Sequence, residues 1–271
     1  MCSTGEVFDA IQKAKAEASE YSTNFFPNLQ KLQEWIAAKE FFGAAVGRTA
    51  FFFRPDRGFW HLYFCAPNRQ ELQGALAAIP KLRTEQFVVD LIGLEPDVKS
   101  WLSSWDSVGF RLYQKLFRMT RPGKGTTPTG DMNDQRIDFA GKPDAIRLFD
   151  MLCQSFDKYA EQLPTLHEIE SATQSRQILA ARSGEKLAGL LYFDDHRFSS
   201  MIRYWLVGSS FRGRGLGSAL MGRYLTHAAS VRRFLLWVIA DNEHAIAKYR
   251  QHGFAPDGLF DYVLANKKIC Q

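Results

Sequence analysis

The sequence has few cysteines and no long hydrophobic run. Its four cysteines lie far apart and form no C-x-x-C pair. This spacing argues against a disulfide framework or a zinc site and predicts free thiols in a reducing cytosol. No apolar stretch approaches the length of a membrane span, and the N-terminus has no basic start followed by an apolar run. We therefore expect a soluble, cytoplasmic protein without a membrane partner.

Charge of one sign is not concentrated anywhere in the chain. The 34 Lys and Arg residues exceed the 29 Asp and Glu residues by five, and the pI is about 9.0. The basic residues are spread out, with no run that would follow a nucleic-acid backbone, so no nucleic-acid partner is expected. A mild positive charge suits a protein that holds a phosphate-bearing ligand.

The length and the apolar content indicate two packed domains. The chain has 271 residues, of which 46% are hydrophobic, and domains of about 100–150 residues are common. Residues 121–134 are crowded with Pro, Gly, Thr and Asp, a composition typical of a linker. We predict a domain over 1–122, a linker over 123–134 and a second domain over 135–271.

Both halves predict an α/β fold with a mixed sheet. Each contains a strand hairpin, a helix, a strand, a helix, a Gly-Phe pair and a strand, in that order, which suggests two copies of one fold. In the first half we expect helices over 7–19, 29–42, 69–79 and 96–106, and a hairpin around 55–58. In the second half we expect helices over 143–153, 159–172 with an interruption near Pro164, 214–229 and 242–251, a hairpin around 184–185, strands over 198–207 and 234–240, and a final strand pair.

A glycine-rich loop between the strand over 198–207 and the following helix has the pattern of an anion site. Small residues let a backbone approach a ligand closely, and the first amides of a helix lack internal partners. With the helix dipole, such amides bind a pyrophosphate. A tight turn with solvated arginines is one alternative. A dinucleotide-binding loop is another, but it requires a different glycine spacing. The loop and its flanks contain Arg212, Gly213, Arg214, Gly215, Leu216, Gly217 and Ser218.

This segment resembles the acetyl-CoA-binding motif of the GNAT acetyltransferase superfamily. The matching residues are Val207, Arg212, Gly215 and Gly217. The resemblance implies that the amides from Arg212 to Ser218 hold the pyrophosphate of acetyl-CoA. It also implies that Leu206 and Val207 pair with the pantetheine arm like an added strand.

A second motif matches the same superfamily. Its residues are Asn242, Ala245, Tyr249, Gly253 and Phe254. Asn242 and Tyr249 are seven positions apart and therefore share one helix face. Taken alone, Tyr249 fits a packing aromatic and Asn242 fits a helix N-cap. The resemblance implies that Asn242 and Ala245 contact the pantetheine and that Tyr249 is the general acid that protonates the leaving sulfur.

The resemblance implies an acetyl-CoA-dependent N-acyltransferase that acts on an amine of a small molecule or peptide. The amine must lose a proton, but the strand over 198–207 carries no carboxylate to accept it. Candidate bases lie elsewhere, and none is assigned. They are Asp194, Asp195, His196, Glu168 and Glu170.

The first half resembles a degenerate copy of the same domain. Where a phosphate loop would stand it has Cys65-Ala66-Pro67-Asn68, without glycine, and Pro67 offers no amide donor. We therefore predict no CoA in this half and no metal in either half. Two further functions stay open: a non-catalytic CoA-binding regulatory module, and an acetyltransferase for protein N-termini or lysines. A homodimer also stays open.

Overall fold

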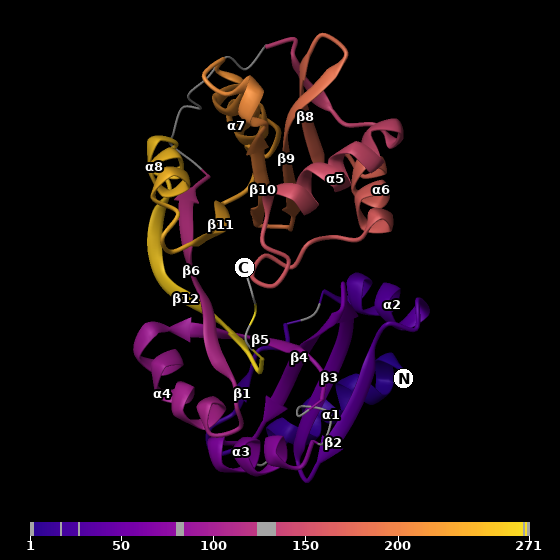
Figure 1. Ribbon diagram of the computed structural model, residues 1–271, viewed down its shortest axis with the longest axis vertical. Helices are drawn as coiled ribbons and strands as arrows, with labels where there is room; N and C mark the ends of the chain where they lie inside the picture. The colour runs from indigo at the N-terminus through magenta and orange to yellow at the C-terminus, as the bar shows by residue number, and fades with distance from the viewer. Residues whose placement is uncertain are drawn as a thin grey trace. The chain divides into compact units, whose positions relative to one another are not determined.

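The computed structural model describes residues 3–16, 18–26, 28–79, 84–123, 134–267 and 269. By its contacts the chain divides into two compact units (Figure 1). Unit 1 comprises Met1–Leu116 and Leu259–Gln271, and unit 2 comprises Phe117–Gly258. Most of the predicted linker, residues 124–133, lies outside the described residues. No helix in the described part of the chain is long and apolar enough to cross a membrane.

Unit 1 contains a sheet with the order β2-β3-β4-β5-β12, in which β4 and β5 are parallel and the other neighbours are antiparallel. The short strand β1 (Ser22–Thr23) pairs with β4. The strands are β2 (Phe42–Val46), β3 (Thr49–Asp56), β4 (Phe59–Ala66), β5 (Phe87–Leu94), the start of β6 (Arg111–Pro122) and the end of β12 (Ala255–Ala265). The helices are α1 (Thr4–Ala16), α2 (Leu29–Ala37), α3 (Arg69–Ala77) and α4 (Glu95–Asp106).

The side chains of unit 1 alternate between two cores because successive strand residues point to opposite faces. On β3, Phe51 packs in a core with Trp105 of α4, whereas Phe52 packs in a core with Leu32 of α2. The sheet is therefore covered by α1 and α2 on one face and by α3 and α4 on the other.

The last strand of the chain completes the sheet of unit 1. Residues 259–265 of β12 pair with β5 from Leu259↔Leu94 to Ala265↔Val88. Tyr262 and Leu264 are buried in the core beside α3 and α4. This strand was predicted to belong to the second domain, because it follows the other elements of that domain along the chain. Its pairing and burial place it in unit 1 instead.

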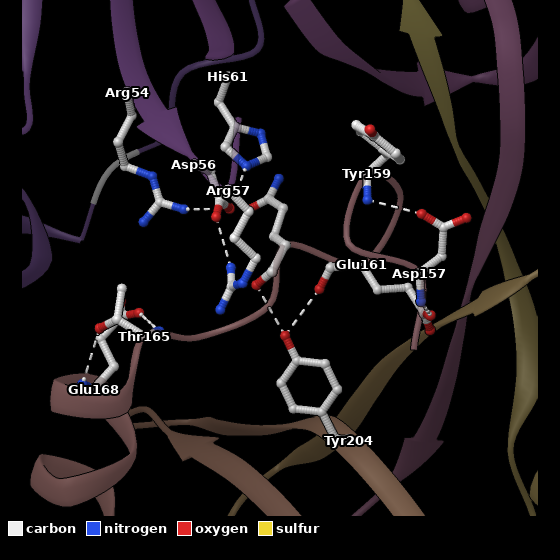
Figure 2. A network of polar contacts seen from close by, with 11 residues as sticks. Arg54, Asp56, Arg57, His61, Asp157, Tyr159, Glu161, Thr165, Glu168 and Tyr204 are labelled. Atoms are coloured by element: carbon white, nitrogen blue, oxygen red, sulfur yellow. Dashed lines mark hydrogen bonds and ion pairs between the residues drawn. The ribbon is translucent and has the colours of Figure 1, made fainter. Parts of the chain in front are cut away.

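A buried polar network lies at the end of the β3–β4 hairpin in unit 1 (Figure 2). The carboxylate of Asp56 lies 3.1 Å from Nε2 of His61, 3.4 Å from Arg54 and 2.6 Å from Arg57. Burial raises the pKa of Asp56, but the hydrogen bond to His61 and the nearby positive charges outweigh it, so the pKa lies below its usual value. The network thus satisfies a buried carboxylate with charged partners.

Unit 2 has the same plan, with two antiparallel hairpins followed by a parallel strand. The end of β6 adds to β11, as the 2.8 Å hydrogen bond from the Gly123 amide to the Arg232 carbonyl indicates. The strands are β7 (Ile137–Phe139), β8 (Ile178–Ser183), β9 (Lys186–Asp195), β10 (Ser199–Val207) and β11 (Arg233–Ile239), and the sheet order is β7-β8-β9-β10-β11. The helices are α5 (Ala145–Ser155), α6 (Leu166–Gln174), α7 (Leu216–His227) and α8 (Glu243–Gln251), with short 3₁₀ turns η2 (Lys142–Asp144) and η3 (Ser209–Phe211).

The sheet of unit 2 is also buried on both faces. On β9, Leu190 packs beneath α5 and α6, and Leu191 packs beneath α7. These two sheets flanked by helices confirm the predicted α/β fold. Two expected helices differ most. The helix predicted over 29–42 ends at Ala37, and Phe42 begins strand β2. The stretch predicted over 159–172, with an interruption near Pro164, is helical only from Leu166, because Pro164 and the N-cap Thr165 precede it.

Candidate functional site

The parallel strands β10 and β11 of unit 2 separate at their carboxyl ends. Their pairing runs from Ser199↔Arg233 to Ile202↔Leu236 and then stops, although β10 continues to Val207. The register between β9 and β10 shifts between Ile202 and Tyr204. This bulge bends β10 away from β11, so that one edge of its last residues has no strand partner within the described part of the chain.

The backbone of Val207 is directed toward that edge. The Gly208 amide donates to the Ala188 carbonyl on β9 at 2.9 Å, and Val207 lies opposite Gly189. Hydrogen-bonded and non-hydrogen-bonded pairs alternate along an antiparallel ladder, so the Val207 amide points away from β9. Gly189 is required here because a Cβ at that position would lie 2.6 Å from the Leu206 carbonyl oxygen.

The glycine-rich loop follows directly and depends on two left-handed glycines. Gly213 has a φ of +77° and Gly215 a φ of +79°, a region that residues with a Cβ adopt at a cost. Gly215 is the N-cap residue of α7. A Cβ at either glycine would meet no atom within 4 Å, so the conformation, and not the space, is what requires glycine in the free protein.

The amides of this loop are arranged as the predicted anion site requires. Among the described residues, no backbone hydrogen bond is made by the amides of residues 213–218, and the first bond into the helix is from Ala219 to the Gly215 carbonyl at 3.0 Å. The N-cap has no side chain to occupy these amides. Unpartnered amides at a helix N-terminus suit a pyrophosphate, so these residues fit the phosphate end of CoA. The edge of β10 that lacks a strand partner fits the extended pantetheine arm of CoA.

Three arginines surround the loop. Arg212 donates to the Val207 carbonyl at 3.3 Å and Arg214 to the Ser210 carbonyl at 3.2 Å. Arg136, which the sequence analysis did not single out, donates to the Arg214 carbonyl at 3.3 Å. It lies 78 positions from Arg214, so no local motif could reveal it. Arg212 and Arg214 carry positive charge beside the loop, whereas the Arg136 guanidinium is paired with the Asp134 carboxylate at 2.6 Å.

The second motif lies on α8. The Asn242 side chain accepts a hydrogen bond from the Ala245 amide at 3.1 Å, so Asn242 is the N-cap residue, as one interpretation predicts. Ala245 is partly buried against the core of unit 2. Tyr249 is buried, and its hydroxyl makes no hydrogen bond to any described residue. Burial, followed by the charge of Glu161, raises the pKa of Tyr249 above its usual value.

Trp205 joins the two motifs and was missed by the sequence analysis. Its ring centroid lies 5.4 Å from that of Tyr249. A Cβ added to Gly217 would lie 3.4 Å from the indole, so α7 begins close to this side chain. Trp205 therefore brings the loop, β10 and α8 together.

Most candidate bases have other partners. Asp194 pairs with Arg203 at 3.0 Å. Glu168 accepts a hydrogen bond from the Thr165 amide at 2.8 Å, in the capping box of α6. Asp195 lies 3.8 Å from His227, and His196 is exposed in the turn between β9 and β10. No group of three or more His, Cys, Asp or Glu side chains suited to a metal ion occurs in the described ranges.

The corresponding place in unit 1 is arranged differently. The Asn68 side chain occupies the Glu71 amide at the start of α3. The Arg69 guanidinium lies 4.7 Å from the ring centroid of Trp101 and donates to the Ser100 carbonyl at 3.1 Å, which joins α3 to α4. One amide at the start of this helix is therefore occupied by a side chain of the protein, in contrast to the start of α7.

Comparison with known proteins identifies the family of unit 2. Residues 145–254 match the acetyltransferase (GNAT) family. Mycothiol acetyltransferase from Corynebacterium glutamicum (strain R) is 32% identical over 111 residues, which are 37% of this chain and 38% of that protein. Mycothiol acetyltransferase from Jonesia denitrificans is 35% identical over 78 residues, 26% of this chain and 24% of that protein. The chain thus matches less than two fifths of the length of these relatives.

Solved structures share the fold over nearly the whole chain. A tandem GNAT protein from the clavulanic acid biosynthesis pathway superposes with a TM-score of 0.64 at 12% identity, covering 98% of this chain and 95% of that one. A GCN5-related N-acetyltransferase from Sphaerobacter thermophilus superposes with a TM-score of 0.57 at 15% identity, covering 96% of this chain and 90% of that one. Both units therefore have GNAT-like folds, and the chain carries an acetyltransferase domain of the GNAT family.

Proposed function

We propose that unit 2 transfers the acetyl group of acetyl-CoA to an amine of a small molecule or peptide. The observation that carries this proposal is the row of unpartnered amides over residues 213–218, next to the open edge of β10. Acetyl-CoA, when bound, supplies the activated acetyl group as a thioester. The loop amides with Arg212 and Arg214 would hold its phosphates, and Leu206 and Val207 would pair with its arm.

The same chain provides groups for the reaction. The Val207 amide is directed toward the edge where the acetyl carbonyl would lie, so it can donate a hydrogen bond to the carbonyl oxygen. Tyr249 keeps its proton and can give it to the departing sulfur. An amine is the acceptor we favour because the partial relatives named above are acetyltransferases and because this family transfers to nitrogen.

We also propose that unit 1 binds no CoA and that the chain is a tandem protein with one cofactor site. Support comes from Asn68, which occupies the amide that a phosphate would need, and from Arg69, which joins α3 to α4. The expected stoichiometry is one acetyl-CoA for each chain.

The test is thiol release from acetyl-CoA with a panel of amines, amino acids, polyamines, peptides and the des-acetyl form of mycothiol. Transfer to at least one acceptor, with calorimetry giving one CoA for each chain, is the expected result. CoA binding without transfer to any acceptor would favour the regulatory module instead. Acetylation of peptide N-termini or lysines alone would place the acceptor among proteins. Absence of CoA binding would contradict the proposal.

A further inference from the structure

The turn between α5 and α6 fixes one carboxylate that the sequence analysis did not consider. Glu161 lies in the segment where a helix was expected, and its Oε2 accepts a hydrogen bond from the Asp157 amide at 2.8 Å. The Glu161 amide in turn donates to the Asp157 carbonyl at 2.9 Å. The Asp157 carboxylate closes the turn by accepting from the Tyr159 amide at 2.8 Å (Figure 2). The side chain of Glu161 is therefore held by its own turn.

A hydrogen bond from β10 ties this turn to the candidate site. The Tyr204 hydroxyl donates to the carbonyls of Glu161 at 2.8 Å and Gln162 at 2.9 Å, and Figure 2 shows the Tyr204 ring rising from β10 to meet the turn. Tyr204 is buried and immediately precedes Trp205, whose ring contacts Tyr249. The turn is thus anchored beside the strand end where the acetyl group would lie.

Glu161 also acts on Tyr249 directly. Within the described residues, it is the one charged group that contributes to the raised pKa of Tyr249. The printed contacts run the same way: Tyr204, which bonds the Glu161 turn, is followed by Trp205, whose ring centroid lies 5.4 Å from that of Tyr249. The turn that holds Glu161 is therefore linked through Tyr204 and Trp205 to the helix that carries Tyr249.

The surroundings of Glu161 suit a proton acceptor. Burial raises the pKa of Glu161 to about 7; the hydrogen bond from the Asp157 amide lowers it, and the charge of Asp157 raises it. The charge of Glu161 raises the pKa of Tyr204 and of Tyr249, and Arg203 and Glu168 also act on Tyr204. General bases are most effective when their pKa lies near the working pH.

We propose that Glu161 accepts the proton of the attacking amine in the acetyl transfer proposed above. In this step the N–C bond forms and the C–S bond breaks. The amine proton moves to the Glu161 carboxylate, and the Tyr249 hydroxyl protonates the sulfur to give the thiol. Proton transfer through water from Glu161 to the Tyr249 phenolate restores both groups, so protons and charge balance. This inference depends on the proposed function.

The test compares wild type with Glu161→Gln, whose side-chain oxygen can still accept from the Asp157 amide. Glu185→Gln, in the exposed β8–β9 turn, is the matched control. Turnover at saturating amine should rise with pH through about 7 in wild type and control, because Glu161 must be deprotonated. In Glu161→Gln that rise should disappear and turnover should fall about 10²–10⁴-fold. Acetyl-CoA affinity by calorimetry should be unchanged.

A second readout does not depend on activity. In ¹³C NMR of protein labelled at the glutamate carboxyls, one signal should titrate near pH 7 and be missing from Glu161→Gln alone. Wild-type turnover and pH dependence in Glu161→Gln would overturn the role of Glu161 while leaving acetyl transfer intact. Failure of wild type to acetylate any amine would overturn both proposals. A Glu161 signal that titrates in the ordinary range would contradict the inference even if the variant were slow.

Discussion

At the scale of single residues, Tyr249 combines a buried ring with a hydroxyl that has no partner among the described residues. Its raised pKa means that it stays protonated through the usual tyrosine range. We expect Tyr249→Phe to lower turnover about 10²–10⁴-fold with little change in acetyl-CoA affinity. The ring contacts with Trp205 and Phe254 are kept, so the melting temperature should be preserved. Turnover at the wild-type rate would remove Tyr249 as the acid.

Asp261 is a residue whose protonation should affect stability. It is buried in unit 1, diagonally across the β5–β12 pair from Asp90, because Asp261 lies opposite Ile92 and Asp90 lies opposite Val263. Burial and then the charge of Asp90 raise the pKa of Asp261 well above its usual value. For a carboxyl with a raised folded-state pKa, the stabilisation is present at low pH and is lost as the pH rises through that value.

We therefore expect Asp261→Asn to raise the melting temperature at neutral and alkaline pH. The difference from wild type should shrink as the pH falls, because wild-type Asp261 is then protonated and neutral like asparagine. Thermal unfolding monitored by circular dichroism across pH 4–9 measures this difference in melting temperature. An equal effect at every pH would mean that the charge of Asp261 is not involved.

At the scale of elements, the loop before α7 should bind phosphate through its amides. Gly215→Val places a branched side chain where the phosphates are expected and strains a left-handed position. We expect acetyl-CoA affinity to fall at least about tenfold, equivalent to about 1.4 kcal/mol. Gly184→Val is the matched control, since Gly184 also has a positive φ and an open Cβ direction but lies in the β8–β9 turn. Calorimetry should show weaker acetyl-CoA binding by Gly215→Val than by Gly184→Val. Equal affinities of the two variants would contradict the proposal that this loop binds the phosphates.

The sequence predicted those elements whose signals are local. Asn68 and Asn242 are helix N-caps where the pattern placed helix starts, and the Arg57-Gly58 turn joins β3 to β4 as expected. Most of the α5–α6 turn was missed because the Asp157 carboxylate accepts a hydrogen bond from the Tyr159 amide, and this bond and the capping box at Thr165 outweigh the helix propensity of the segment. The separation of β10 and β11 depends on pairing between distant segments, which residue patterns do not record. Glu161 was overlooked for the same reason, since only the fold brings it to Tyr204.

At the scale of the whole molecule, the chain's last strand stabilises the unit that contains its beginning. Tyr262 is buried in the core of unit 1, and its hydroxyl donates to Glu95 at 2.9 Å. Removing a buried aromatic side chain typically costs about 3–5 kcal/mol. Tyr262→Ala should therefore destabilise unit 1 although position 262 follows all of unit 2 in the sequence.

The two units make this effect measurable in separate segments of one chain. In hydrogen–deuterium exchange, Tyr262→Ala should reduce protection in β4 and β5, which belong to unit 1, more than in β9 and β10 of unit 2. Acetyl-CoA affinity should stay near wild type, because every residue proposed to hold it lies within 117–258. Tyr262→Phe, which keeps the ring and loses only the hydrogen bond to Glu95, is the control and should be much milder. Equal loss of protection in all four strands would mean that unfolding of unit 1 carries unit 2 with it.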